Sequence, residues 1–231
     1  MNARLLPARG LYAITPDTAD TVLLLARCRA LLHCAHPPAL LQYRNKCLPK
    51  DEQWAQARAV QAVCRAANVP FIVNDSLEMA LALDADGLHL GQEDGDLATA
   101  RAALGTNRIL GATCHDSCQL AQQAAAAGAD YLAFGAFFPS PSKPAARRAS
   151  IDVLRTAHAR FAHLPLVAIG GITAENAAPL LDAGAHWLAV IGDLFDADDI
   201  AARAAHYAAR FAARTCGSLA ATKAATSSGG R

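Results

Sequence analysis

The sequence predicts an α/β protein built as a single-domain (β/α)8 barrel, the TIM-barrel architecture. Short apolar runs alternate with Ala-rich helical stretches along the chain, and the alternation yields eight units. The 231 residues, 53% of them hydrophobic, suffice to bury one large core. Apolar runs between helices are typical of a parallel sheet covered by helices, and eight such units close a barrel. An open doubly wound sheet is the alternative.

The elements follow from the hydrophobic pattern. Eight apolar runs predict strands at 11–14, 39–43, 71–74, 87–90, 109–113, 131–135, 166–169 and 187–191. Between them, apolar residues at helical spacing predict helices that include 51–67, 117–127, 151–161 and 174–183. Gly128 and Gly184 each stand where a helix end needs a left-handed residue, so both have a structural explanation.

The domain organisation is simple. Residues 1–214 are expected to form the catalytic barrel domain. Residues 215–231 consist mostly of Gly, Ser, Thr and Ala, and such a segment buries too little apolar surface to offset its ordering entropy. We therefore expect a flexible C-terminal tail at 215–231.

Charge and cysteine content restrict the class of protein. The net charge is +1, from 21 basic and 20 acidic residues, so neither a nucleic-acid nor a membrane partner is expected. The seven cysteines are odd in number and lack a Cys-x-x-Cys spacing, which argues against a disulfide framework or a zinc ribbon. The first ten residues lack the apolar core of a signal peptide. A cytoplasmic protein fits best, and a homo-oligomer is left open.

A first polar cluster ends the second predicted strand. Because strand side chains alternate between faces, Gln42, Arg44 and Lys46 are expected to share one face, with Tyr43 and Asn45 on the other. The Arg fork and the Lys ammonium suit phosphate oxygens, and the Gln amide can orient a heterocycle. A basic strand end that faces solvent is the alternative.

A second cluster carries carboxylates. Asn74 and Asp75 end the third strand, while Glu93 and Asp94 follow the fourth. Hard oxygen ligands of this kind hold Mg²⁺ together with substrate phosphates, so we expect Asp75 and Asp94 to bind the metal. Glu93 is an alternative to Asp94, and Asp75 or Ser76 has the alternative role of helix cap.

The last three strands are followed by candidate anion-binding segments. Ser140, Ser142 and Lys143 lie in a long loop that could contact a phosphate, unless it is only a proline-rich turn. Gly171 after the seventh strand and Gly192 after the eighth would let backbone N–H groups approach a phosphate, although paired glycines also turn a chain.

The histidines near these strand ends are expected to be structural. His89 lies inside an apolar strand and His186 begins another, which indicates hydrogen-bonded core or junction residues rather than ligands or bases. Cys114 and His115 are adjacent on a strand and face opposite ways, so a nucleophilic dyad is disfavoured.

Taken together, five segments in register resemble the thiamine-phosphate synthase (thiamine-phosphate pyrophosphorylase) family, from about Gly10 to Phe195. The segments are Gln42-Tyr43-Arg44-Asn45-Lys46, Val73-Asn74-Asp75, Gly87-Leu88-His89-Leu90-Gly91-Gln92-Glu93-Asp94, Pro139-Ser140-Pro141-Ser142-Lys143-Pro144 and Ile169-Gly170-Gly171-Ile172. The resemblance implies a transferase of a pyrimidinylmethyl group in thiamine biosynthesis. It would join 4-amino-2-methyl-5-hydroxymethylpyrimidine diphosphate to a thiazole phosphate and release diphosphate, with Mg²⁺ as cofactor and a dissociative mechanism.

The resemblance also implies roles for the candidate residues. The pyrimidine diphosphate would be contacted by Gln42, Arg44, Lys46, Asn74, Thr113 and Lys143. The thiazole phosphate would be contacted by Ser140, Ser142, Gly171, Ile191 and Gly192. Asp75 and Asp94 would hold Mg²⁺, and Arg44, Lys46 and Lys143 would be catalytic by neutralising the leaving diphosphate.

The chain departs from the family pattern at four positions. Thr113 replaces a usual Ser, and Ser140 and Ser142 replace usual Thr residues, so the hydroxyls are kept. Gly192 replaces a common Ser and leaves only a backbone N–H for the thiazole phosphate. The alternative functions are a thiazole tautomerase-like paralogue, another phosphate-handling barrel enzyme, and a non-catalytic sensor of thiazole or thiamine phosphate.

Overall fold

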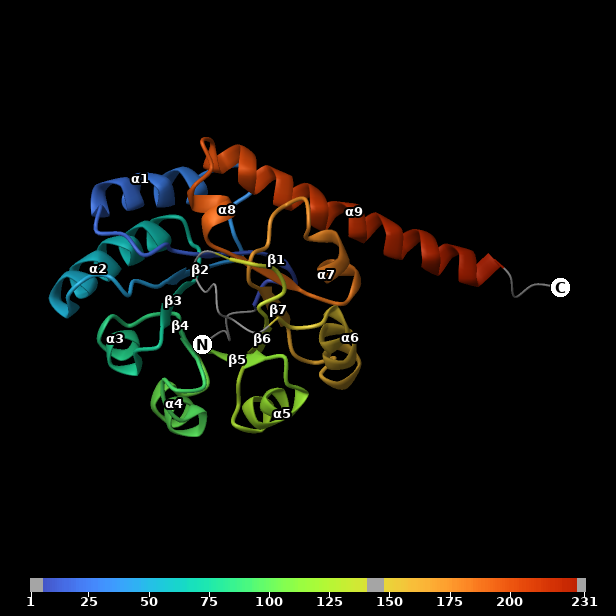
Figure 1. The fold of residues 1–231 in the computed structure, drawn as a ribbon, viewed down its shortest axis with the longest axis horizontal. Coiled ribbons are helices and arrows are strands. Elements are labelled where there is room, and N and C mark those ends of the chain that lie inside the picture. Colours follow the sequence, from blue (N-terminus) through green and yellow to red (C-terminus); the bar gives the residue numbers. More distant parts are fainter. Residues whose placement is uncertain (1–5, 141–147, 228–231) are drawn as a thin grey trace.

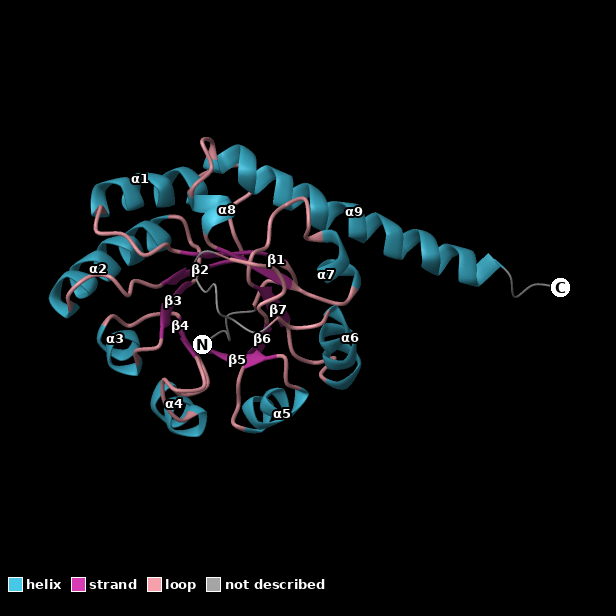
Figure 2. Ribbon diagram, viewed as in Figure 1, coloured by secondary structure: helices cyan, strands magenta, loops and turns pink. Residues whose placement is uncertain are grey.

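The chain folds into a closed barrel of eight parallel strands surrounded by helices (Figure 1; Figure 2). The computed structural model describes residues 6–140 and 148–227, and for 215–227 it describes the backbone alone. The strands are β1 (Gly10–Ile14), β2 (Leu40–Tyr43), β3 (Phe71–Asn74), β4 (Gly87–Leu90), β5 (Ile109–His115), β6 (Tyr131–Phe134), β7 (Leu166–Ile169) and β8 (Trp187–Val190). Each strand pairs with the next, and β1 pairs with β8, so the predicted (β/α)8 barrel is confirmed and the open sheet is excluded.

Helices follow the strands and form the outer layer in Figure 2. They are α1 (Thr21–Leu32), α2 (Lys50–Ala66), α3 (Leu77–Ala82), α4 (Leu97–Leu104), α5 (Cys118–Ala126), α6 (Ile151–Arg160), α7 (Ala178–Asp182), α8 (Gly192–Phe195) and α9 (Ile200–Ser227). Most begin at a side chain that accepts a hydrogen bond from the first turn, as Ser76 does from the Met79 N–H at 3.1 Å. The predicted left-handed glycines are also present, with φ of 87° at Gly128 and 102° at Gly184.

Two apolar cores hold the layers together. One fills the barrel interior and consists of alternate strand residues, among them Tyr12, Ile72, Tyr131 and Trp187. The other lies between the strands and the helices and takes the opposite strand faces, such as Leu41 and Val73. The barrel is therefore a packed core, and its polar groups emerge at the strand ends.

Helix α7 is shorter than predicted. The expected helix spans 174–183, but the observed one begins at Ala178. The Thr173 N–H donates to Asn176 Oδ1, and the Asn176 N–H donates to Thr173 Oγ1, so these side chains close a turn in place of the first helical residues.

Helix α9 closes the barrel against β1 and α1 and then extends beyond the ring of helices in Figure 1. Its buried residues are Ile200, Ala204, Tyr207 and Phe211, a helical stripe. The backbone stays helical to Ser227, as an Ala-rich segment favours, so most of the segment predicted as a separate tail continues α9. Its flexibility stays a prediction. Among the described residues, no helix has the length and apolar character needed to cross a membrane.

Candidate active site

The predicted phosphate and metal residues gather at the carboxyl ends of the strands. Gln42 faces the barrel interior, where its Nε2 donates to Tyr12 Oη at 2.7 Å. Tyr43 and Asn45 face the helix layer instead, and both donate to Gln56 Oε1 of α2, at 3.0 and 2.8 Å. The alternation predicted for this strand end is therefore observed, with Arg44 and Lys46 left at the mouth of the barrel.

The loop after β1 holds the end of β2 in place. Thr15 Oγ1 donates to the Arg44 carbonyl and accepts from the Arg44 N–H, both at 2.8 Å. Asp17 pairs with Arg44 Nη1 at 2.7 Å and accepts the Lys46 N–H at 2.7 Å. Sequence reasoning missed both residues, because an isolated Thr-Pro-Asp segment is also a common turn.

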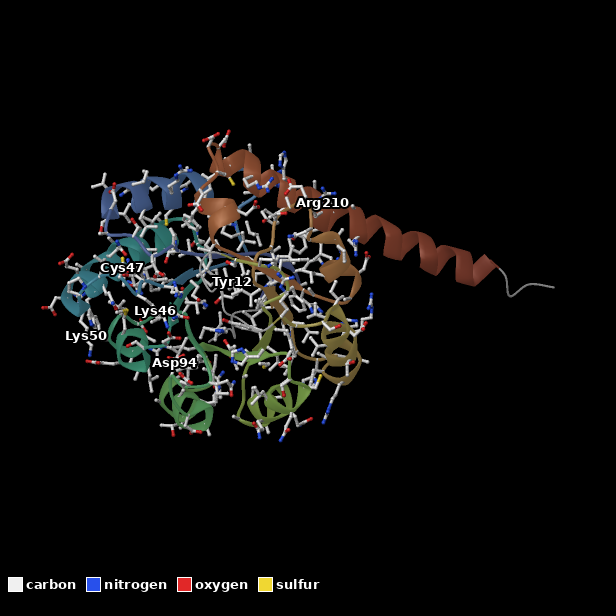
Figure 3. The ribbon with its side chains drawn as sticks, in the orientation of Figure 1. Tyr12, Lys46, Cys47, Lys50, Asp94 and Arg210 are labelled. Atoms are coloured by element: carbon white, nitrogen blue, oxygen red, sulfur yellow. The ribbon has the colours of Figure 1, made fainter. Side chains whose placement is uncertain are left out.

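The two predicted metal ligands meet beside Lys46. Lys46 Nζ lies 2.9 Å from Asp75 Oδ2, and Asp94 is in hydrogen-bond contact with Asp75. Figure 3 places Lys46 and Asp94 on the side of the barrel covered by α2, α3 and α4. Glu93 has no such contact with Asp75 among the described interactions, so the geometry favours Asp94 over Glu93.

The electrostatics of this acid pair suit a cation. Partial burial, and then the hydrogen bond and the charge of Asp75, raise the pKa of Asp94 above its ordinary value. The Gly91 N–H, which donates to Asp94 Oδ2 at 3.0 Å, and Lys46 act in the opposite direction. Two adjacent carboxylates that repel each other are stabilised by a divalent ion, so the donor set fits Mg²⁺. Among the described residues no group of three or more His, Cys, Asp or Glu side chains could hold a metal, so further ligands would come from water or substrate.

Asn74 and Ser76 complete this side of the site. A cavity of about 320 Å³ is lined by Tyr43, Arg44, Asn45, Lys46, Gln53, Asn74, Asp75, Ser76 and Met79. Ser76 caps α3, as its alternative role predicted, whereas Asp75 does not cap and instead adopts a φ of 65°. A left-handed conformation is uncommon for a residue other than glycine, and here it accompanies the ion pair with Lys46. A second cavity of about 330 Å³ lies among Asp84, Arg108 and their neighbours, away from these residues.

The loops after β6 and β7 lie against each other. Gly171 has a φ of 59°, and a Cβ there would lie 2.2 Å from the Pro139 carbonyl oxygen. The Phe138 N–H also donates to the Gly170 carbonyl at 3.0 Å. The structure thus packs Phe138 and Pro139, the residues before Ser140, against the paired glycines and gives these glycines a packing role. Ser142 and Lys143 lie outside the described residues.

After β8, Ile191 and Gly192 form the start of α8. The next residue, Asp193, pairs with Arg203 Nε at 2.8 Å and accepts from the Tyr207 hydroxyl. Arg203 Nη1 also pairs with Glu175 at 2.7 Å and lowers the pKa of Glu175 to about 2. This ion-pair cluster ties the β7 loop and α8 to α9. Sequence reasoning missed it, since its members are far apart in the chain.

A chain of polar side chains runs through the upper barrel interior. Tyr12 Oη lies 2.7 Å from Tyr131 Oη, and Tyr131 Oη lies 2.9 Å from His89 Nδ1. His89 Nε2 lies 2.9 Å from Thr113 Oγ1. Tyr12, near the barrel axis in Figure 3, also accepts from Gln42. The predicted core role of His89 is borne out in that it is buried and hydrogen-bonded, while the two tyrosines were missed.

His186, Cys114 and His115, which were expected to have no catalytic role, lie in structural positions. His186 Nδ1 accepts the Leu166 N–H at 3.1 Å at the start of β8. Cys114 is buried and burial raises its pKa to about 12, whereas the neighbouring His115 is exposed. A thiol that is buried and protonated beside an outward-facing histidine is unsuited to nucleophilic attack.

The chain is similar to known proteins over most of its length. A family model described as thiamine monophosphate synthase matches residues 11–194. The thiamine-phosphate synthase of Aromatoleum aromaticum is 56% identical over 203 residues, which are 88% of this chain and 96% of that protein. That of Methylobacillus flagellatus is 52% identical over 201 residues, 87% of this chain and 94% of that protein.

A solved structure agrees with these relatives. The thiamine phosphate pyrophosphorylase from Pyrococcus furiosus superposes with a TM-score of 0.73 at 31% identity, covering 87% of this chain and 94% of that one. The family match over residues 11–194 spans strands β2 to β8, most of β1 and the loops that carry the acid pair. This chain belongs to the thiamine monophosphate synthase family.

Proposed function

We propose that this protein is a thiamine-phosphate synthase, which joins 4-amino-2-methyl-5-hydroxymethylpyrimidine diphosphate to thiazole phosphate and releases diphosphate. The observation that carries the proposal is the Asp75–Asp94 pair beside Lys46, with Arg44 on the same strand end. A tautomerase-like paralogue handles no diphosphate and has no need of this arrangement. Family membership supports the same activity.

The pyrimidine diphosphate would bind at the ends of β2, β3 and β5. Gln42 and Asn74 would contact the pyrimidine half, while Arg44, Lys46 and Thr113 would face the diphosphate. Arg44 gives one nitrogen to Asp17 and keeps further N–H donors for phosphate oxygens, because a guanidinium has five.

Asp75 and Asp94 are the residues that would hold Mg²⁺. The ion would supply positive charge to the diphosphate and thereby make it a better leaving group.

The chemistry exchanges one bond for another. The bond between the pyrimidine methylene carbon and the diphosphate oxygen breaks, and the diphosphate keeps the electron pair. Arg44, Lys46 and Lys143 would stabilise the negative charge that grows on that oxygen. The resulting pyrimidine cation is stabilised by its amino group, and the thiazole nitrogen then donates an electron pair to the methylene carbon.

The thiazole phosphate would bind on the opposite side of the mouth. Ser140, which follows the Pro139 that packs on Gly171, would contribute from this side, and Ile191 and Gly192 begin α8 after β8. Ser142 would add a hydroxyl from the same loop as Ser140. Gly192 offers only its backbone N–H, so the backbone supplies most of the anion contacts at this end.

The test is diphosphate release with Mg²⁺ and both substrates, compared with the same mixture without thiazole phosphate. We expect release that depends on thiazole phosphate, together with formation of thiamine phosphate. Lys46→Met should slow it strongly, whereas Lys50→Met, a matched exposed lysine on α2, should leave it unchanged. Binding of thiazole phosphate without turnover would identify a sensor, and thiazole isomerisation without diphosphate release would identify a tautomerase.

The remaining partners and the setting are part of the same proposal. Small phosphorylated substrates are the only partners that the site requires, and neither a nucleic acid nor a membrane is needed. We place the reaction in the cytoplasm, where the free cysteines among the described residues would stay reduced.

A further inference from the structure

A series of hydrogen-bonded side chains runs from Gln42 to Thr113 inside the barrel. It contains five side chains joined by four hydrogen bonds, and we call it the hydrogen-bond chain. The partners are Gln42 with Tyr12, Tyr12 with Tyr131, Tyr131 with His89, and His89 with Thr113, at 2.7, 2.7, 2.9 and 2.9 Å. One end, Gln42, is proposed to face the pyrimidine, and the other end, Thr113, is proposed to face the diphosphate.

The number of protons available determines which group donates and which accepts in each of these hydrogen bonds. An amide nitrogen cannot accept a hydrogen bond, so Gln42 Nε2 donates and Tyr12 Oη accepts. Burial raises the pKa of both tyrosines, so each phenol keeps its single proton. Among the described contacts, Tyr131 Oη is the one acceptor within reach of the buried Tyr12 hydroxyl, so the Tyr12 proton points to Tyr131, and the Tyr131 proton is left for His89 Nδ1. His89 carries its own proton on Nε2 and donates it to Thr113 Oγ1.

The two ends of this order match the proposed substrate. Thr113 accepts from His89, so its own hydroxyl proton points away from the chain, and diphosphate oxygens can only accept. The side-chain nitrogen of Gln42 donates to Tyr12 inside the barrel. Its side-chain oxygen, Oε1, can therefore accept from a donor such as the exocyclic amino group of the pyrimidine. The reverse order would set the lone pairs of Thr113 against an anion, which is unfavourable.

We propose that the Tyr12–Tyr131–His89 chain fixes the proton order of the site, holding His89 as the Nε2–H tautomer so that Thr113 donates a hydrogen bond to the leaving diphosphate. This role rests on the proposed synthase activity for its substrate, but the proton order itself does not. Tyr12, Tyr131 and His89 are positioning residues, since they act through Gln42 and Thr113.

The direct test is the tautomer of His89 in the intact protein, read by nitrogen-15 NMR of the histidine rings. The spectrum of His89→Gln identifies the His89 signals among those of the eight histidines. We expect the proton on Nε2, with Nδ1 unprotonated. A proton on Nδ1, or an equal mixture, would overturn the proposal. The measurement needs no substrate, so it stands even if the protein proves to have another activity.

Activity provides the second test through a double-mutant cycle. Thr113→Val removes the hydroxyl at nearly constant shape, and Tyr131→Phe removes the donor to His89 Nδ1. Each single change should lower kcat by roughly fivefold to fiftyfold, with a smaller effect on KM. In the Tyr131→Phe background, Thr113→Val should lower kcat much less than it does in the parent protein, because the order of the hydrogen-bond donors is already lost. Independent, multiplicative effects would overturn the proposal.

A conservative pair keeps the test clear of folding effects. His89→Gln retains an acceptor for Tyr131 and a donor for Thr113, whereas His89→Leu retains neither. We expect His89→Gln to keep most of the kcat that His89→Leu loses, with both measured at a temperature at which thermal unfolding shows each variant to be fully folded. Equal losses of kcat would count against the proposed role.

Discussion

Asp75 and Asp94 should bind a metal ion favourably, but without the ion their mutual repulsion should lower the stability of the folded protein. At an effective dielectric constant of 20, two unit charges 4 Å apart repel by about 4 kcal/mol. Lys46 lies 2.9 Å from Asp75 and offsets much of this repulsion. Asp94 is also exposed to solvent, which screens the remainder. The net repulsion left for Asp94 is therefore on the order of 0.5–1 kcal/mol.

Asp94→Asn tests this estimate with almost no change in shape. The amide oxygen can still accept from the Gly91 N–H, and the amide nitrogen can donate to Asp75. Without metal, the variant should be more stable than the parent protein by about 0.5–1 kcal/mol, a rise in Tm of roughly 1–4 °C for a chain of this size. Its synthase activity should nevertheless be largely lost.

The assay is thermal unfolding at neutral pH and low salt, without and with Mg²⁺ plus inorganic diphosphate. At about ten times their apparent Kd, the ligands should stabilise the parent protein by about 1.4 kcal/mol and Asp94→Asn much less. Glu93→Gln is the matched control, because it removes the neighbouring charge without touching Asp75. A lower Tm for Asp94→Asn without metal, or an equal rise for Glu93→Gln, would refute the reasoning.

Three further predictions concern other parts of the site. Gly171→Ala should raise the KM for thiazole phosphate, because its Cβ would lie 2.2 Å from the Pro139 carbonyl oxygen at a φ of 59°. Gly105→Ala, at another left-handed glycine but in open space, should lower stability without changing that KM. The lowered pKa of Glu175, about 2 against an ordinary 4.5, means that its ion pair with Arg203 stabilises the fold above pH 4.5 and is lost as the pH falls toward 2. Glu175→Gln should therefore flatten the acid side of the stability profile, by no more than about 1 kcal/mol for so exposed a pair, and an unchanged slope in thermal unfolding at several pH values would contradict this. Lys143→Ala should lower kcat more than it weakens substrate binding, and an unchanged rate constant for the chemical step would count against a role in diphosphate departure.

The sequence predicted the barrel and the acid pair because both follow from local patterns. Apolar runs of strand length between helices leave few other arrangements, and polar residues at the ends of neighbouring parallel strands must meet at one face. Asp75 and Asp94 were predicted on this basis and lie in contact. Each ends a strand or follows one closely, so its position depends on few other residues.

The residues that sequence reasoning missed depend on distant partners. Tyr12 and Tyr131 stand in apolar strands, where an aromatic side chain is most simply explained by packing, and their hydroxyls meet across 119 residues of chain. Asp17 lies in a loop, and only the fold brings it to Arg44. No spacing in the sequence reports such contacts. The same holds for the turn at Thr173 and Asn176, which shortened a predicted helix.

The pairing of β1 with β8 has a consequence for how the ring is assembled. Gly10 is the partner of Trp187, so the two strands that close the barrel, β1 and β8, lie near opposite ends of the folded sequence. During synthesis, β1 and β7 must each keep an unpaired edge until β8 has left the ribosome, and exposed edges of this kind invite association with other chains. Shortened versions that stop before Val190 would keep both edges open permanently, and we expect them to aggregate rather than fold into a smaller barrel.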